Sequence, residues 1–570
     1  MGMYERQLLG YNTKLLTIGG KLLRLFATGL YTFDEVNTLI YTEGYIPVAT
    51  PDEMVAMRYA VSQTMGAGSP WEGTYTTGYN KKYIQVNKLD FSLLAAEYEP
   101  DSTAFSGTFD GNELMITNFN VTETSDKLTG LFFGNTGTIK NIRVTANISF
   151  YNAGGIVAQI NNGTIDNCIT FGSIEKNTTG GGNPTVGGIC GTNGDVTGTP
   201  TISNCINYAS VTSTFNVPVG GIAGQAINCT GTIENCTNYG TINGVSNAAG
   251  IIGNGTSTTT TGCKNYGAVT GTTNTGGIAG TGSSATSTSC INYGDITGTS
   301  PVGGIFGLGT SATTTGCKNY GIITATGNNT GGIIGSGAGC LAEECENHGA
   351  VDQTGLFVGG IVGLLDSGGD VLYCTNTAAI TGTVGHIGGI VGRAYSTLSA
   401  NHSTIKYCSN TGSVTNSAAS ATSGTGGLVG ALVQYADLEN SYNTGTITAS
   451  NYVGGATGWM VTAPPTVLNC YSMGIITSAG TYRGGLVGRL QNGTVTNSYY
   501  DSQTSGMSDT GKGLPRTTAQ MKYGTASSFI NSDGTTDATE DPANAMYTAW
   551  STDIWDFLTT ADYPELKPEV

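Results

Sequence analysis

A five-residue glycine signature recurs along most of this chain, and no other feature limits the possible folds as strongly. The signature reads Gly-Gly, an aliphatic residue, any residue and Gly, and its copies extend from about residue 128 to residue 500. Most copies lie 27 to 33 residues apart, with one interval of 38, and a fixed period of this size is typical of a solenoid. The second position of the copies falls at residues 130, 155, 188, 221, 250, 277, 304, 332, 360, 389, 427, 455 and 485.

Within each unit, three β-rich patches are separated by residues that favour turns. In residues 276–302 the patches carry Ile278, Cys290 and Ile296 as apolar anchors. Isoleucine, valine and threonine favour extended chain, whereas the intervening glycine, asparagine, serine and aspartate favour turns. No apolar stripe with the 3.6-residue period of a helix spans a unit. The sequence therefore predicts an all-β fold, a parallel β-helix solenoid of about 13 triangular coils stacked about 4.8 Å apart.

Ten of the thirteen cysteines recur at one position of the repeat. In three other units we assign this position to Ile142, Tyr442 and Tyr499, so the position accepts large apolar side chains. We therefore expect the cysteines to point inward as small buried hydrophobic residues with free thiols, which favours folding in a reducing compartment. No Cys-x-x-Cys pair is present, so no zinc site is expected. The column comprises Cys168, Cys205, Cys236, Cys263, Cys290, Cys317, Cys345, Cys374, Cys408 and Cys470.

Two further columns follow the cysteines. An asparagine lies two residues after most cysteine positions, and stacked asparagines at a bend can hydrogen-bond their amides from coil to coil. The residue after the asparagine is aromatic in six consecutive units. These rings could stack on sugar faces while Asn and Thr side chains bond the sugar hydroxyls, or they could stack on one another, and both interpretations stay open. The asparagines are Asn207, Asn238, Asn265, Asn292, Asn319, Asn347, Asn376, Asn410 and Asn443, and the aromatic stripe is Tyr208, Tyr239, Tyr266, Tyr293, Tyr320 and His348.

The charge and the apolar pattern of the chain argue against several classes of function. The formal net charge is −17 and charged residues make up only 11% of the chain, so we expect no binding to nucleic acid or to an anionic membrane. No run of eighteen apolar residues is present, so no membrane insertion is expected. The first residues also lack the pattern of a secretory signal.

Acidic and histidine side chains in the repeats are too sparse to predict an active site. Three glutamates crowd one turn and are interpreted as a solvated edge, two aspartates lie outside any recognised calcium loop, and three histidines lack the spacing of metal ligands or of a catalytic base. We therefore expect a protein that is not an enzyme and has no cofactor or metal, with a glycoside hydrolase or lyase as the alternative. These residues are Glu343, Glu344 and Glu346, then Asp366 and Asp370, then His348, His386 and His402.

The segments that flank the repeats are expected to hide the open ends of the solenoid, because exposed strand edges promote polymerisation. At the front, Thr50 and Pro51 begin a helix predicted over residues 51–62, with Met54, Met57 and Val61 on one face. At the back, three aromatic residues are expected to cover the last coil. The predicted segments are an N-terminal attachment segment (1–45), a capping helix with the first β layers (46–127), the β-helix (128–500) and a C-terminal cap (501–570) with Trp550, Trp555 and Phe557.

The signature and both flanks resemble the GLUG-repeat family. Residues 46–57 (IPVATPDEMVAM) are similar to an entry helix common in these proteins, residues 105–121 (FSGTFDGNELMITNFNV) to the strand pair before the repeats, and residues 499–522 to their usual ending. The resemblance covers about 46–570, and the chain departs from it at Thr457 and Glu113, which concerns local packing. It implies a right-handed parallel β-helix, a role in bacterial surface adhesins or phage tail proteins, and no shared catalytic residues.

Among these roles, the absent secretory pattern and the cysteine column favour a phage tail fibre that contacts the host surface, because a fibre folds in the host cytoplasm and leaves by lysis. Its expected location is the virion tail. Its expected partners are a host-surface polysaccharide or protein receptor, other tail or baseplate proteins bound through residues 1–45, and two further copies in a homotrimer. The alternatives are a bacterial cell-surface adhesin and, second, a polysaccharide-depolymerising tail spike.

Overall fold

The computed structural model of the chain describes residues 17–18, 21–22, 29–94, 98, 103–122, 128–150, 152–160, 162–176, 185–193, 199–226, 231–418, 423–462, 464–522, 547, 549–557 and 562–568. These residues form two compact units. Unit 1 comprises Met1–Ser213, Gly221–Gln225 and Cys229–Gly240, and unit 2 comprises Thr214–Gly220, Ala226–Asn228 and Thr241–Val570.

Both units are built from short parallel strands, so the predicted parallel β-solenoid is confirmed. In unit 1 the longest strands, β10 (Met115–Thr122), β14 (Arg143–Phe150) and β18 (Ile169–Lys176), pair in parallel, each with the strand one coil further along. In unit 2 one coil consists of β36 (Thr286–Thr288), β37 (Ile291–Asn292), β38 (Ile296–Gly298), β39 (Ser300–Gly303) and β40 (Phe306–Leu308).

The three β-rich patches predicted for each repeat are present, and bends divide them into the five strands of one coil. Ser289, whose φ of 53° lies in the left-handed region, separates β36 from β37, and Gly304 and Ile305 separate β39 from β40. The predicted anchors Ile278, Cys290 and Ile296 have no exposed surface. The core of unit 2 is therefore a column of stacked aliphatic and cysteine side chains.

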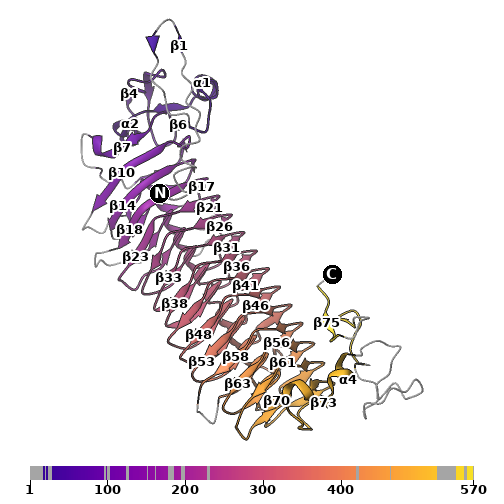
Figure 1. Ribbon diagram of the computed structural model, residues 1–570. Helices are drawn as coiled ribbons and strands as arrows, with labels where there is room; N and C mark the ends of the chain where they lie inside the picture. The colour runs from indigo at the N-terminus through magenta and orange to yellow at the C-terminus, as the bar shows by residue number, and fades with distance from the viewer. Residues whose placement is uncertain are drawn as a thin grey trace. The chain divides into compact units, whose positions relative to one another are not determined.

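In each coil, the strands equivalent to β37 and β38 belong to one sheet. The outer surface of this sheet carries the aromatic stripe of unit 2. Their register is one residue to its equivalent, as in Asn292↔Asn319 and Ile296↔Ile323. Figure 1 shows the β38-type strands following one another along the coils. They are β33 (Val269–Thr270), β38, β43 (Ile323–Ala325), β48 (Val351–Gln353), β53 (Ile380–Gly382), β58 (Val414–Asn416), β63 (Ile447–Ala449) and β68 (Ile476–Thr477).

Unit 1 begins with two capped helices, α1 (Phe33–Tyr41) and α2 (Pro51–Ala56). The helix predicted over 51–62 is correct at its start, where Thr50 forms a capping box with Glu53, but it ends at Ala56. Met54 and Met57 are buried as expected, whereas Val61 lies beyond the helix and is exposed. The chain turns there because β4 (Ser62–Met65) begins an antiparallel hairpin with β5 (Gly73–Thr76).

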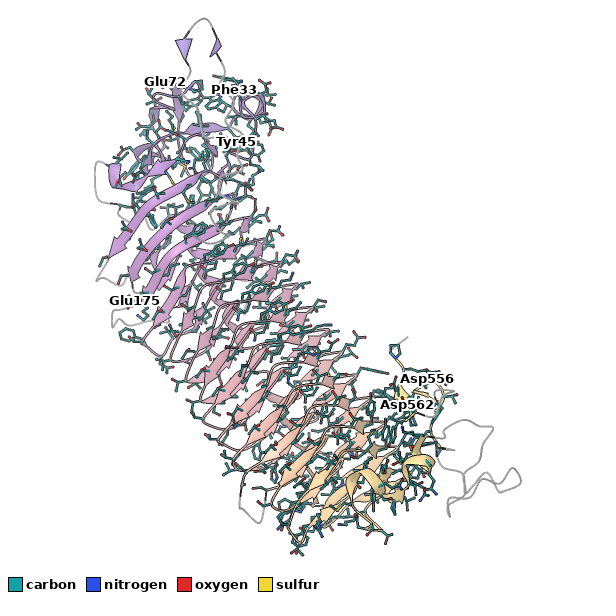
Figure 2. The ribbon with its side chains drawn as sticks, viewed as in Figure 1. Phe33, Tyr45, Glu72, Glu175, Asp556 and Asp562 are labelled. Atoms are coloured by element: carbon teal, nitrogen blue, oxygen red, sulfur yellow. The ribbon has the colours of Figure 1, made fainter. Side chains whose placement is uncertain are left out.

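Helix α1 lies inside the segment that the sequence assigns to attachment. Its buried Val36 and Ile40 share one apolar core with Ala49, Trp71 and Ile84, so residues 29–45 are packed with the residues that follow them. Figure 2 marks Phe33, Tyr45 and Glu72 in this part of unit 1. The rest of the predicted attachment segment, apart from the short strands β1 (Thr17–Ile18) and β2 (Lys21–Leu22), lies outside the described residues.

The C-terminal segment of unit 2 covers the side of the last coils as well as their edge. Strand β73 (Leu514–Arg516) extends the sheet by pairing with β72 (Tyr499–Asp501), and α3 (Ser502–Ser505) and α4 (Thr518–Lys522) flank it. Trp550 and Trp555 pack against Tyr471, which projects from the outer face of the sheet. Strands β74 (Trp555–Asp556) and β75 (Glu565–Leu566) complete this segment, in which Figure 2 marks Asp556 and Asp562.

The helices of the described segments are short, and the longest, α1, has nine residues, so none of them could span a bilayer.

Candidate functional site

The asparagine column supports the aromatic stripe from inside. The side chain of Asn292 is fully buried, and its Nδ2 donates hydrogen bonds to Oδ1 of Asn319 on the next coil (2.8 Å) and to the carbonyl oxygen of Gly294 (2.8 Å). Its Oδ1 accepts from Nδ2 of Asn265 on the preceding coil (2.8 Å). The same pattern continues in unit 2 to Asn443, and in unit 1 Asn207 donates to Asn238 (2.8 Å). Because these amides are buried, they cannot contact a ligand at the surface.

The second glycine of each signature lies against this column. A Cβ atom on Gly304 would overlap the carbonyl oxygen of Gly332 and would lie 2.6 Å from Cγ of Asn319. Gly277 and Gly332 are equally crowded by Asn292 and Asn347. The glycine signature and the asparagine column are therefore two halves of one packing arrangement, in which the missing side chain makes room for the amide.

The aromatic rings form stacks within each unit. In unit 1, Phe171 stacks on Tyr208 (ring centroids 5.1 Å apart) and Tyr208 on Tyr239 (4.9 Å). In unit 2 the centroid distances are 4.7 Å for Tyr266 and Tyr293, 5.2 Å for Tyr293 and Tyr320, and 4.8 Å for Tyr320 and His348, with interplanar angles of 9° to 12°. Sequence reasoning missed Phe171, although it follows Cys168 at the same offset as the tyrosines.

This stacking decides which part of each ring a ligand can reach. Tyr293 and Tyr320 have an aromatic ring against both faces, so a sugar cannot stack on them and can meet only the ring edge and the phenol hydroxyl. The five tyrosines keep between 39% and 43% of their surface exposed. Binding of a glycan by this stripe stays a prediction, and its chemistry would be hydrogen bonding by hydroxyls rather than stacking.

Exposed threonines extend the stripe across the sheet, and the sequence analysis did not single them out. Thr270, Thr297 and Thr324 are successive outward residues on β33, β38 and β43, paired Thr270↔Thr297 and Thr297↔Thr324. Two residues later, Thr272, Thr299 and Thr326 are also exposed. The sequence pattern that could have identified these threonines is Thr-x-Thr directly after each buried aliphatic anchor. We name the surface formed by Tyr266, Tyr293, Tyr320, His348 and these six threonines the Tyr–Thr face.

The Tyr–Thr face changes character at His348. Glu346 lies beside it and binds both Nζ of Lys318 (2.9 Å) and Nε2 of His348 (2.8 Å), while Nδ1 of His348 contacts the Thr377 hydroxyl (2.8 Å). Burial alone would raise the pKa of Glu346, but the hydrogen bonds from Lys318 and His348 outweigh it, and the pKa lies below its ordinary value. A carboxyl group with a lowered pKa is poorly suited to act as a general acid at neutral pH.

The cysteine column lies in the core. Cys205, Cys236, Cys263, Cys290 and Cys317 are fully buried, and all twelve cysteines within the described part of the chain are free thiols. Burial raises the pKa of Cys205, Cys374 and Cys470, which keeps these thiols protonated and unreactive. Cys229 lies outside the described residues.

Two residues assigned to the cysteine position lie elsewhere. Tyr442 pairs with Ser409 and Tyr499 pairs with Tyr471, so both tyrosines project outward, whereas Ile142 lies at the cysteine position as expected. The cysteine position of those two coils holds Ser441 and Ser498, which are buried and donate to the carbonyl oxygens of Glu439 (2.7 Å) and Thr496 (2.8 Å). Neighbouring residues of a strand face opposite sides, so a slip of one residue exchanges inside and outside.

The remaining acidic residues do not converge. No group of three or more His, Cys, Asp or Glu side chains that could hold a metal occurs in the described ranges. Burial raises the pKa of the Asp370 carboxyl, and Asp366 accepts a hydrogen bond from the neighbouring Ser367 hydroxyl (2.9 Å). His402 contacts the Asp437 carboxylate (2.6 Å).

His386 gives unit 2 a pH-dependent stability. Its ring lies between Phe357 and Trp459, with centroids 5.8 Å from each, and its Nδ1 accepts a hydrogen bond from the Gly424 N–H (3.0 Å). Burial, aided by the charge of Arg393, lowers its pKa from 6.5 to about 4. Between these values the unfolded chain binds a proton that the folded chain does not, so the free energy of unfolding falls as pH falls through this window.

We expect this loss to reach about 2–3 kcal/mol at pH 4.5 relative to pH 7. Denaturant unfolding at both pH values should show the loss in the wild type, and the loss should be smaller by that amount in His386→Gln. Equal losses in the two proteins would show that protonation of His386 is not coupled to folding.

The geometry of the chain can now be compared with known proteins. Residues 383–415 and 421–448 match the family described as the GLUG motif, so the chain is a β-solenoid that carries GLUG motifs. A protein of Evansella cellulosilytica named "Putative Gly-rich membrane protein" is 41% identical over 92 residues, which are 15% of this chain and 10% of that protein. The chain thus matches about a tenth of that relative's length.

A solved structure also aligns with part of this chain. It is titled as a putative immunoglobulin A1 protease from Bacteroides ovatus, shares 18% sequence identity, and aligns with 58% of this chain and 80% of its own chain. The TM-score is 0.32, which is too low to support an argument about activity.

Proposed function

We propose that this chain is the ligand-binding part of a bacterial cell-surface adhesin. The observation that carries the proposal is the Tyr–Thr face of unit 2. It presents exposed, uncharged hydroxyl groups in columns along the coils, with one set of equivalent groups per coil. A hydroxyl both donates and accepts hydrogen bonds, so the face is suited to a ligand that is itself rich in hydroxyls, such as a polysaccharide.

Repetition supports the same role. Equivalent groups recur about every 4.8 Å along the coil axis, and the two threonine columns lie about 6.6 Å apart along the strand. Each contact with a sugar is weak, but a polymer that spans several coils engages several equivalent sites at once, which raises the overall affinity. A long regular face is therefore useful for retaining a repetitive surface polymer, and less so for a single small ligand.

The name of the Evansella protein, which describes a Gly-rich membrane protein, supports the proposed surface location. A solenoid segment of a longer, membrane-anchored protein would be held away from the cell and would meet a host or neighbouring-cell polymer with its side. This supports the adhesin over the tail fibre expected from the sequence.

A tail fibre is the second candidate, and the free cysteine column favours it. A fibre folds in the reducing cytoplasm, where buried cysteines such as the twelve among the described residues do not form disulfides. An antibody against the chain distinguishes the two: labelling of intact bacterial cells supports the adhesin, and detection in purified virions supports the fibre.

Removing two rings from the Tyr–Thr face should weaken polymer binding. Purified wild type is first tested for retention on beads of dextran, mannan and chitin. On the polymer that retains the wild type, we expect retention of Tyr293→Ala/Tyr320→Ala to be about tenfold lower. The stability should fall by only about 1–3 kcal/mol, from the lost ring stacking. The matched control is Tyr41→Ala/Tyr59→Ala, which removes two exposed tyrosines outside the face and should leave retention unchanged. Unchanged retention in the first variant, or no retention of the wild type, would contradict the proposal.

A further inference from the structure

A second group of aromatic rings in unit 2 surrounds two arginines. Arg489, on β70 (Val487–Leu490), has its guanidinium 4.7 Å from the ring centroid of Tyr482, 5.2 Å from that of Tyr452 and 5.7 Å from that of Trp459. It also donates a hydrogen bond to the Tyr452 hydroxyl (2.5 Å). Tyr482 is 39% exposed, so one wall of this group faces solvent.

Arg393 forms the other end of the group. It lies on β55 (Val391–Tyr395), with its guanidinium 4.9 Å from the ring of Tyr395 and 5.3 Å from that of Phe357. His386 joins the two ends, because its ring contacts both Phe357 and Trp459. We name His386, Arg393, Tyr452, Trp459, Tyr482 and Arg489 the arginine–aromatic cluster.

The register of the strands explains how Arg393 and Arg489, almost a hundred positions apart in the sequence, belong to one cluster. Arg393, Ala431, Trp459 and Arg489 are paired one coil after another on β55, β60 (Val429–Val433), β65 (Thr457–Val461) and β70. The coil between Arg393 and Trp459 carries only Ala431 here, and Gly424 beside His386. Two small residues in one coil let the Trp459 ring reach His386 across it.

The two arginines differ in their partners from four other cations of the repeats. Lys140, Arg143, Lys318 and Lys406 each form an ion pair with a carboxylate at 2.8 to 3.1 Å. Across the described segments, neither Arg393 nor Arg489 has a carboxylate within 4.0 Å. Arg393 and Arg489 lack an ion pair although acidic side chains are in excess, with 39 acidic and 22 basic side chains in the chain.

The cluster also contains donors that the protein does not use. Within the described residues, Nε of Arg393 and Nε1 of Trp459 are buried without an acceptor. A buried donor left without a partner destabilises the folded state, so such groups in a native structure call for an explanation. Because these two donors lie inside the cluster, the groups that a ligand can reach are the half-buried Arg489 and the exposed ring of Tyr482.

We propose that the arginine–aromatic cluster binds carboxylate-bearing sugars, such as the uronic acid residues of an acidic polysaccharide. The planar guanidinium of Arg489 matches a carboxylate with two parallel hydrogen bonds, and the surrounding rings hold it in place. The exposed Tyr482 ring offers an apolar surface for the sugar ring beside it. The inference rests on the proposed function, because it names the class of glycan, but it concerns a site separate from the Tyr–Thr face.

The test uses the full chain and two matched polymers, polygalacturonate and its methyl ester, in which the carboxylates are neutral. We expect the wild type to bind polygalacturonate and to bind the ester about tenfold more weakly or less. Arg489→Gln should weaken binding of polygalacturonate by about tenfold or more, and Arg489→Lys should recover part of it, because lysine keeps the charge and loses the planar fork.

Arg483→Gln is the matched control. Arg483 precedes Arg489 by six residues, is exposed and donates to the Ser478 carbonyl oxygen (2.9 Å), so its replacement removes the same charge near the same place. Binding by this variant should stay within about twofold of the wild type.

Equal binding of polygalacturonate and its ester by the wild type would overturn the proposal, and this arm needs no variant to fold. Equal effects of Arg489→Gln and Arg483→Gln would overturn it as well, since only the net charge would then matter. Failure of both polymers to bind would overturn the acidic-sugar site, while retention on neutral beads would leave the adhesin proposal intact.

Discussion

Gly304→Ala should lower the stability of the solenoid by about 3 kcal/mol or more, although it adds a single methyl group. The new Cβ would overlap the Gly332 carbonyl oxygen and lie 2.6 Å from Cγ of Asn319. Both neighbours belong to the next coil, where the carbonyl and the amide are fixed by hydrogen bonds. Relief would require the two coils to separate locally, which breaks the strand pairing Val302↔Thr330 beside them.

Gly309→Ala is the control for this prediction. Gly309 lies five residues further on, and a Cβ there would come no closer than 3.3 Å, to the Ala312 methyl. Its unfolding free energy should change by less than about 1 kcal/mol, and the smaller entropy of the unfolded alanine chain favours a slight gain. Both variants are measured by urea unfolding followed by circular dichroism. Similar midpoints for the two would show that the glycine signature is not required for coil contact.

The parallel solenoid could be predicted from the sequence because its physical cause is local and repeated. Each coil needs a close approach at the same place, and glycine is the residue that permits it, so the period of the signature gives the period of the coils. The inward position of Ile278, Cys290 and Ile296 follows from the same periodicity, since these anchors recur with the signature.

The orientation of Tyr442 and Tyr499 could not be predicted by the same reasoning. An apolar residue in a repeat is normally assigned to the core, but these tyrosines project outward and are covered by the C-terminal segment. The ring centroids of Tyr442 and Trp555 are 6.3 Å apart, and those of Tyr499 and Trp550 are 6.0 Å apart. The spacing to Asn443 identifies Ser441 as the true inward residue. The asparagine column is therefore the better guide to register in the last coils.

The aromatic stripe could be located from the sequence, but the accessible part of each ring could not. Which faces are covered depends on the separation of the coils relative to the thickness of a ring. At the observed centroid distances of 4.7 to 5.2 Å, Tyr293 and Tyr320 are sandwiched. The arginine–aromatic cluster was beyond prediction, because it depends on the small residues Gly424 and Ala431 in the coil whose signature follows an interval of 38 residues.

The asparagine column itself should carry much of the cohesion between coils. Asn292→Ala removes the bonds to Asn319 and Gly294 and the bond from Asn265. It leaves Nδ2 of Asn265 with one of its two hydrogen bonds and removes the donor to Oδ1 of Asn319. Each such group costs about 1–3 kcal/mol, so we expect a loss of about 3–5 kcal/mol in the free energy of unfolding.

Asn292→Ser should lose less, about 1–2 kcal/mol, because a hydroxyl can still accept from the preceding coil. The chain contains this arrangement already, where Ser472 accepts from Nδ2 of Asn443 (3.3 Å). Thr297→Ala, an exposed change in the same coil, should alter stability by less than about 0.5 kcal/mol. The three variants differ in burial and in hydrogen bonding, so urea unfolding ranks these two causes directly. If Asn292→Ala proved no less stable than Thr297→Ala, the amide column would contribute no net free energy, and the cohesion between coils would come from strand pairing and the apolar core.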